Sequence, residues 1–220
     1  MVETTKRLRK LSFICGILSS LLYFCADILG GMIWGNYDFT TQYISELSAI
    51  DASSRSFVVS LYILYNIIVI PFALGVLRFA GRKRVLRITG GMLIGYIATG
   101  LAGLFFPMDP SGTATTFTNI MHQIFAGVIV FFILLSLGFG AAAFATWFRY
   151  YSIGIILVYL VLGALPFLSV VQFEAGQPIP WVGLVERMMV YGYVLWVSVL
   201  SLVLMRMVRD ETQLTAAISN

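Results

Sequence analysis

Six long apolar segments determine what this chain can fold into. Each holds about 20 mostly apolar residues, the length that an α-helix needs to cross a bilayer. They cover residues 11–34, 57–79, 88–106, 117–143, 151–171 and 182–208. Inside a bilayer every backbone polar group must find its hydrogen-bond partner within the chain, so we expect these segments to be helices. The sequence therefore predicts an all-α, polytopic membrane protein with six transmembrane helices.

The composition excludes the two other broad classes of chain. Hydrophobic residues make up 60% of the 220 residues and charged residues 11%, whereas a soluble domain is about 45–50% apolar and about 25% charged. A globule with so few charges would present a large apolar surface and would aggregate. Intrinsic disorder needs low hydrophobicity and a high net charge, and this chain has neither. We expect residues 1–220 to form a single domain without linkers.

The first apolar segment follows a basic start and so resembles a signal peptide. Its apolar run is far longer than the roughly 7–15 residues of a signal core. The segment also lacks a small-residue cleavage site at its end. We therefore expect it to remain in the protein as the first transmembrane helix.

The basic residues lie on one side of these spans. Of the 14 lysines and arginines, all but Arg55 and Arg187 fall in the amino-terminal tail, the second or fourth connection, or the carboxyl-terminal end. With six spans these four regions lie on the same side, and the positive-inside rule makes that side the cytoplasm. We predict a multi-pass protein of the cell (inner or plasma) membrane with both termini cytoplasmic. The basic side could also bind anionic lipid head groups, and we expect no nucleic-acid partner.

Polar side chains gather toward the opposite, external side. They lie in the outer half of the first span, in the first two external connections and at the external starts of the fourth and sixth spans: Asp27, Tyr43, Ser45, Glu46, Asp109, Asn119, His122, Gln123, Glu186, Arg187 and Tyr191. Polar groups inside a membrane are costly, so such a cluster invites a functional explanation. We hypothesise a polar pocket, formed by these residues, that opens to the extracytoplasmic side.

Three of these side chains share one face of the fourth predicted helix. Asn119, His122 and Gln123 are related by spacings of i, i+3 and i+4, which bring side chains together on a helix. Apolar membrane helices rarely group three such residues unless that face looks into the protein or into a wet cavity. We expect this face to contribute to the pocket.

The charged residues of the first and sixth spans need partners. Glu186 and Arg187 are adjacent and point in different directions, so we do not expect them to be each other's partner. An ionised Asp27 near lipid is unfavourable, so it should pair with Arg187 or Arg55, or stay protonated through desolvation. An ion pair of this kind could be purely structural, and Glu186 with Arg187 could simply anchor the sixth helix.

The leading hypothesis is that the pocket binds a membrane lipid or another amphiphile. Arg187 would hold an anionic head group, because a guanidinium recognises phosphate and carboxylate through paired hydrogen bonds. Glu46 and His122 would hold hydroxyl or amine groups, and the apolar walls of the helices would take the chain. No cofactor is implied.

The first alternative is a membrane-embedded lipid hydrolase or transferase, and whether the protein is an enzyme stays open. His122 would be the general base, oriented by Asp109 or Glu46, and Ser45 would supply a nucleophile. No nucleophile-elbow motif is present. One histidine cannot make a three-histidine zinc site, so we predict no metal, although a mixed histidine–carboxylate site stays open.

Two further alternatives need no lipid chemistry. The protein could be a structural or accessory subunit of a membrane complex, with a membrane-protein partner or a second copy of itself. It could also be a small proton-coupled carrier that uses Asp27, although the inner half of the predicted bundle has no comparable polar path. His122, the single histidine, could be a structural hydrogen-bonding residue rather than a functional one.

Several short motifs resemble one known family. They are Tyr43-Ile-Ser-Glu-Leu-Ser-Ala49, Phe106-Pro107-Met108-Asp109 followed by His122, Phe148-Arg149-Tyr150-Tyr151-Ser152, and Gly183-Leu-Val-Glu186-Arg187 with Tyr191 and Trp196. Together they resemble the signature of the prokaryotic membrane family known as domain of unknown function 998, which often has glycine where this chain has Ser48. More remotely, the first loop and His122 look like the eukaryotic Frag/DRAM/Sfk group of six-span proteins, which is implicated in lipid remodelling, lipid asymmetry and autophagy-linked membrane functions.

The resemblance implies a six-helix bundle and no established activity. Carried over residue by residue, it points to positions that the polarity argument also selects: Ser45, Glu46, Asp109, His122, Glu186 and Arg187.

Overall fold

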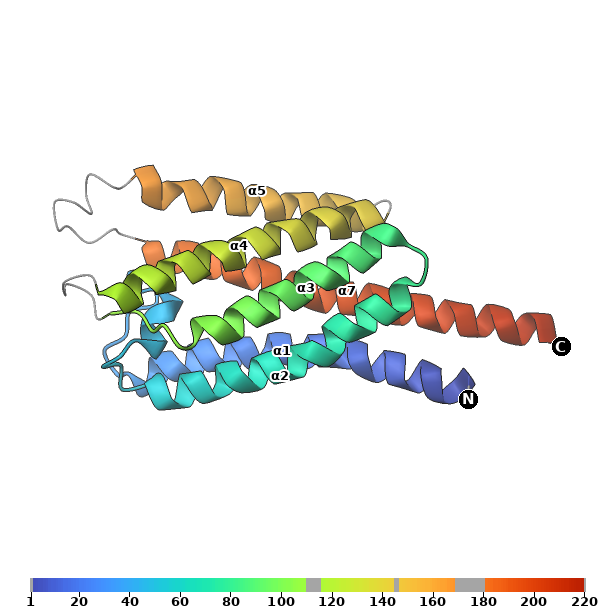
Figure 1. The fold of residues 1–220 in the computed structure, drawn as a ribbon, viewed down its shortest axis with the longest axis horizontal. Helices are drawn as coiled ribbons and strands as arrows, with labels where there is room; N and C mark the ends of the chain where they lie inside the picture. Colours follow the sequence, from blue (N-terminus) through green and yellow to red (C-terminus); the bar gives the residue numbers. More distant parts are fainter. Residues whose placement is uncertain (1, 110–115, 145–146, 169–180, 220) are drawn as a thin grey trace.

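Six long helices form the fold (Figure 1). The computed structural model describes residues 2–109, 116–144, 147–168 and 181–219, in which these helices are α1 (Val2–Ile33), α2 (Arg55–Ala80), α3 (Arg84–Gly103), α4 (Phe117–Ala143), α5 (Trp147–Leu168) and α7 (Val182–Ser219). A short 3-10 helix, η1 (Ile44–Ser48), lies in the connection between α1 and α2. Each of the six long helices is long and apolar enough to span a membrane. The predicted all-α architecture with six spans is confirmed.

The helix ends differ from the predicted spans where charged residues continue a helix. The fourth helix has the predicted bounds, 117–143. The first and last helices extend well beyond their apolar segments, to Val2 and to Ser219. Lysine, arginine, glutamate and glutamine are good helix formers, so apolarity marks where a helix lies in the membrane but not where it ends. Residues 169–171 of the fifth predicted span lie outside the described residues.

The helices are arranged as a ring in chain order. Each packs on the next, from α1 to α5 and on to α7, and α7 packs back on α1. Both termini and the α2–α3 connection lie at one end of the bundle, and η1 lies at the other end against α1, α2 and α7 (Figure 1). We call the first the basic end, because it holds most lysines and arginines, and the second the loop end.

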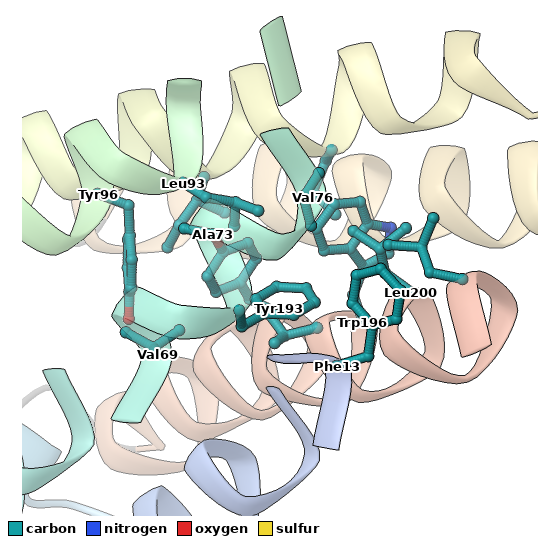
Figure 2. Packing of buried hydrophobic residues seen from close by; sticks show 14 of the residues in the cluster. Phe13, Val69, Ala73, Val76, Leu93, Tyr96, Tyr193, Trp196 and Leu200 are labelled. Carbon is teal, nitrogen blue, oxygen red and sulfur yellow. The ribbon is translucent and has the colours of Figure 1, made fainter. Parts of the chain in front are cut away.

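A core of apolar and aromatic side chains fills the ring (Figure 2). Trp196 of α7 is fully buried in it, and its indole N–H donates to Ser152 Oγ on α5 at 2.8 Å. A Cβ at Gly140 on α4 would collide with the indole ring. Lipid tails are as apolar as leucine, so close packing and internal hydrogen bonds, rather than burial alone, hold membrane helices together. Trp196 supplies both and joins three helices.

Candidate functional site

A buried ion pair joins the first and last helices at the loop end. Arg187, near the start of α7, donates from Nε to Asp27 Oδ2 at 2.9 Å and from Nη2 to Asp27 Oδ1 at 2.8 Å. The Tyr191 hydroxyl, one turn further along α7, also donates to Asp27. Asp27 is 0% exposed and Arg187 6%. The two parallel bonds are the strongest geometry for an arginine–carboxylate pair. Of the three outcomes expected for Asp27, pairing with Arg187 is the one that the structure shows.

The rest of the guanidinium group holds the α1–α2 connection in place. Arg187 Nη1 donates to the carbonyl oxygens of Phe39 at 2.7 Å, Gln42 at 3.1 Å and Gly183 at 3.1 Å. Its Nη2 donates to the Tyr37 hydroxyl at 2.5 Å, and the group lies over the rings of Tyr37 and Phe39. An arginine has five N–H donors, and protein acceptors engage the whole set. Arg187 therefore acts as a clamp on the loop and has no N–H left for the anionic head group that the sequence hypothesis assigned to it.

Gly183 lets α7 come close enough for this clamp. A Cβ at this position would collide with the carbonyl oxygens of Phe39 and Gln42. The next residue, Leu184, donates its N–H to the Thr40 carbonyl oxygen at 3.1 Å. The sequence analysis did not select Gly183 as a site residue, because its role depends on a contact with a segment about 140 residues away in the chain.

The two carboxylates near η1 hold its first turn. Glu186 Oε2 accepts the Ile44 N–H at 2.5 Å, so Glu186 and Arg187 have different partners, as predicted. Glu46, which is 5% exposed, accepts the Tyr43 N–H at 3.0 Å and the Gln42 side-chain amide at 3.1 Å. Negative groups at the start of a helix satisfy its free N–H groups and complement its dipole.

The two tyrosines of this connection keep their protons at neutral pH. Burial, together with the nearby carboxylates of Glu186 and Glu46, raises the pKa of Tyr43 to about 12. Burial also raises the pKa of Tyr37, and the hydrogen bond from Arg187 opposes that shift in part. Tyr37 can therefore donate its proton to the Tyr43 carbonyl oxygen at 2.7 Å while it accepts from the guanidinium group.

A second polar cluster lies at the α3–α4 connection. The Asp109 carboxylate, in a residue that is 6% exposed, accepts the N–H and the hydroxyl proton of Thr116, both at 2.9 Å. The Thr116 hydroxyl caps α4 by accepting the Asn119 N–H at 3.3 Å. The Asn119 side chain accepts the Asp109 N–H at 3.4 Å. Asp109 and Asn119 thus fix the start of α4, a common role for such residues.

His122 is half-buried, and its imidazole ring has a defined tautomer. Its Nδ1 lies 3.0 Å from the Phe106 carbonyl oxygen. A carbonyl oxygen only accepts, so Nδ1 carries the proton, and Nε2 of the neutral ring is an acceptor. Gln123 is exposed on the bundle surface. Asn119, His122 and Gln123 therefore do not all face the interior, contrary to the prediction.

Met108 connects the two clusters. Its carbonyl oxygen accepts the Ile50 N–H at 3.3 Å, and its sulfur accepts the Ser45 hydroxyl proton at 3.4 Å. Ser45, His122 and Asp109 thus each bond to a different group, and the candidate catalytic triad is not assembled. Within the described residues no three His, Cys, Asp or Glu side chains are grouped to bind a metal ion.

The comparison with known families decides where this chain belongs. The model of the family described as "Protein of unknown function (DUF998)" matches residues 17–203, a range that includes both polar clusters. The chain belongs to the DUF998 family. No curated protein and no solved structure matches it, so the more remote resemblance to the Frag/DRAM/Sfk group stays a prediction.

The interior of this DUF998 bundle also contains tyrosines that the sequence analysis missed. The Tyr23 ring stacks on Tyr62 and meets Tyr65 edge-on, with centroid distances of 5.5 and 5.3 Å. The hydroxyls of Tyr65 and Tyr96 are 2.9 Å apart. The sequence does contain a pattern that could have identified some of them, because Tyr62, Tyr65 and Asn66 share one face of α2 by their spacing. Tyrosines in apolar segments are easily counted as hydrophobic residues, although each carries a polar hydroxyl.

Three buried polar atoms of the bundle interior have no hydrogen bond of ordinary geometry among the described residues, although the Tyr62 hydroxyl still interacts with that of Tyr23. They are the hydroxyl oxygens of Tyr62 and Tyr159 and the side-chain oxygen of Asn66. Buried polar groups without partners are rare in native proteins, and each one calls for an explanation.

Proposed function

We propose that this DUF998 protein is a multi-pass protein of the cell membrane that binds a lipid or a related amphiphile at its loop end, with that end facing outward. The positive-inside rule supports the orientation, because twelve of the 14 basic residues belong to segments at the basic end, which would face the cytoplasm. Both termini would then be cytoplasmic.

The observation that carries the proposal is the set of unpartnered buried oxygens in the interior of the bundle. A buried polar group without a hydrogen bond costs about 1–3 kcal/mol, and Tyr62, Tyr159 and Asn66 contribute three such groups. Membrane interiors offer no free water to satisfy them. A polar head group that enters this region would supply the missing hydrogen bonds and remove that cost.

The chemistry of these groups indicates the kind of head group. Glu186 supplies carboxyl oxygens as acceptors, and its Oε2 accepts the Ile44 N–H. The tyrosine hydroxyls can donate or accept, and the Asn66 oxygen accepts. This set of groups would bind a head group that carries hydroxyl or amine donors.

The charged pair would have a different role from the one expected from sequence. Asp27 and Arg187 satisfy each other and the loop, so they would hold the α1–α2 connection over the site rather than contact the ligand. Tyr191, which also bonds to Asp27, would position α7 in the same way. Glu186, one residue before the clamp, would then be held at a fixed place beside the ligand.

A lipid-retention experiment tests the proposal. The full chain is purified in mild detergent, and co-purifying lipids are counted by native mass spectrometry beside Glu186→Gln. Glutamine keeps an acceptor for the Ile44 N–H but removes the charge, so the loop contact survives. Asp210→Asn, which removes an exposed carboxylate at the basic end outside the groove described below, is the matched control. Loss of a hydrogen bond to a charged group costs about 1.5–3 kcal/mol, so lipid retention should fall roughly tenfold or more.

The same experiment gives the contradicting outcome. If Glu186→Gln retains as much lipid as Asp210→Asn and the natural chain, the loop end is not a lipid site. A pair of variants, Tyr62→Phe and Tyr159→Phe, checks the result, because each removes one unpartnered hydroxyl and leaves the ring packing in place.

A further inference from the structure

A groove of different character lies at the basic end. It lies between α1 and α2 and has a volume of about 300 Å³. Leu8, Arg9 and Ser12 of α1 and Gly75 and Arg78 of α2 line it. The α1 residues lie in the first turns of its apolar span, and the α2 residues lie in the last turns of its span, beside α1. Both helix ends belong to the basic end (Figure 1). In a membrane the groove would therefore lie near the surface of the bilayer.

Small residues give the groove an uncharged floor. A Cβ at Gly75 would lie 2.6 Å from the Ser12 Cβ, so the two helices are close together there. The Ser12 hydroxyl donates to the Leu8 carbonyl oxygen at 3.0 Å within α1. The Leu8 side chain, at 57% exposure, adds an apolar wall that faces outward.

Two arginines stand at the rim with little to neutralise them. The Arg9 guanidinium lies over the Phe79 ring, 5.7 Å from its centroid, and is 3.7 Å from the Glu211 carboxylate, whose side chain is 58% exposed. Such an exposed and distant pair contributes little attraction. Arg78 is exposed, and no carboxylate of the described residues forms an ion pair with it. Both guanidinium groups are thus accessible to an anion.

We propose that this groove binds an anionic phospholipid, with the phosphate between Arg9 and Arg78 and an acyl chain against Leu8 and Gly75. Guanidinium groups bind phosphate oxygens through paired hydrogen bonds. A phospholipid joins its phosphate directly to an apolar chain, which matches a groove with two cations at the rim and uncharged walls. Free phosphate would use the arginines alone. The site shares no residue with the loop end and does not depend on the function proposed there.

The test compares two double variants that lose the same charge. The full-length protein in mild detergent is titrated with a short-chain phosphatidylglycerol, with a phosphatidylcholine of the same chain length, and with inorganic phosphate, and the bound fraction is read by native mass spectrometry. Arg9→Gln/Arg78→Gln removes the groove cations. Arg82→Gln/Lys83→Gln, at exposed positions in the α2–α3 connection, removes two neighbouring charges.

The expected result is a preference for phosphatidylglycerol that depends on the groove. The groove variant should bind phosphatidylglycerol roughly tenfold or more weakly, whereas the control variant should stay within about twofold of the natural chain. Arg9→Lys/Arg78→Lys should fall between the two, because lysine keeps the charge but lacks the planar fork. If the glutamine variant does not fold, the lysine variant still tests the proposal, because it keeps both charges.

Two outcomes would overturn the proposal. Equal weakening in both glutamine variants would mean that the lipid is attracted by general positive charge and not by this groove. Inorganic phosphate that binds as tightly as phosphatidylglycerol, and competes with it, would mean that the groove recognises a free anion and that the apolar walls have no role.

Discussion

The two ends of the bundle use arginine in opposite ways. At the loop end Arg187 is 6% exposed, and protein acceptors from α1, the first connection and α7 surround its guanidinium group. At the basic end Arg78 is exposed and forms no ion pair within the described residues. A charge removed from water is tolerable only where protein groups replace its hydration. Buried arginines therefore hold structure together, and exposed ones stay available for ligands.

This contrast corrects a natural reading of the sequence. Arg187 looks like the obvious binding residue, because a charge in an apolar span is rare. In the structure, however, the Arg187 guanidinium group fixes the first loop in place. The groups with unused hydrogen-bonding capacity are less conspicuous in the sequence. They are the tyrosines of the interior and the arginines of the basic end.

The largest expected effect comes from breaking the buried pair. Asp27→Ala would leave the Arg187 charge buried without its partner, at a cost of about 3–5 kcal/mol in the free energy of unfolding. Thermal unfolding in detergent would measure it. The comparison is with Arg78→Gln at the basic end, which should change stability by less than about 0.5 kcal/mol. Similar losses from both variants would show that the two ends do not differ as described.

A double variant sharpens this result. Asp27→Leu/Arg187→Met removes both charges, and its loss of stability should be smaller than the sum of the two single losses, because no uncompensated charge remains. Additive losses would mean that Asp27 and Arg187 act independently, which would contradict the paired geometry.

The next effect concerns the approach of α7 to the loop. Gly183→Ala would push a methyl group into the carbonyl oxygens of Phe39 and Gln42, and overpacking of this kind costs about 1–3 kcal/mol. Gly154 on α5 is the matched control, since a Cβ there meets no atom within 4 Å. Gly154→Ala should be neutral or stabilising by up to about 1 kcal/mol, because alanine is the better helix former. Thermal unfolding of the two variants would decide whether the close approach matters.

The sequence was sufficient for the spans and for one pair of residues. Hydropathy located all six helices, and the cost of a lone charge in an apolar helix made Arg187 one of two partners expected for Asp27, the other being Arg55. The sequence could not show that Arg187 also binds carbonyl oxygens of the first loop, because every residue has a backbone carbonyl group whatever its side chain. For the same reason the sequence could not predict the roles of Gly183 and of the Phe106 carbonyl group beside His122. Such contacts depend on which helices become neighbours.

A smaller effect tests the unpartnered hydroxyls. If a bound lipid satisfies Tyr159, then Tyr159→Phe should lower stability by about 1 kcal/mol in the lipid-bound protein. After complete delipidation the same variant should be equal to or more stable than the natural chain, because it no longer buries an unsatisfied group. Tyr65→Phe is the control, since the Tyr65 hydroxyl bonds to Tyr96 in the protein itself. It should destabilise the protein under both conditions, and the same pattern for Tyr159→Phe would argue against a ligand there.

The smallest effect is expected from an exposed carboxylate in the loop that Arg187 holds. The Thr40 N–H and the Thr41 hydroxyl each donate to Asp38 at 2.8 Å, and these bonds lower the pKa of Asp38 below its ordinary value. A lowered pKa in the folded state means that the charged form adds stability above the ordinary pKa of an aspartate, about 3.9, and that this contribution is lost as the pH falls through the lower, folded value. Unfolding temperatures measured from pH 6 to pH 3 should therefore fall less steeply for Asp38→Asn than for the natural chain, and Thr41→Val, which removes one donor, should lie between them. Curves that coincide for all three chains would show that the order of this loop comes from the Arg187 clamp alone.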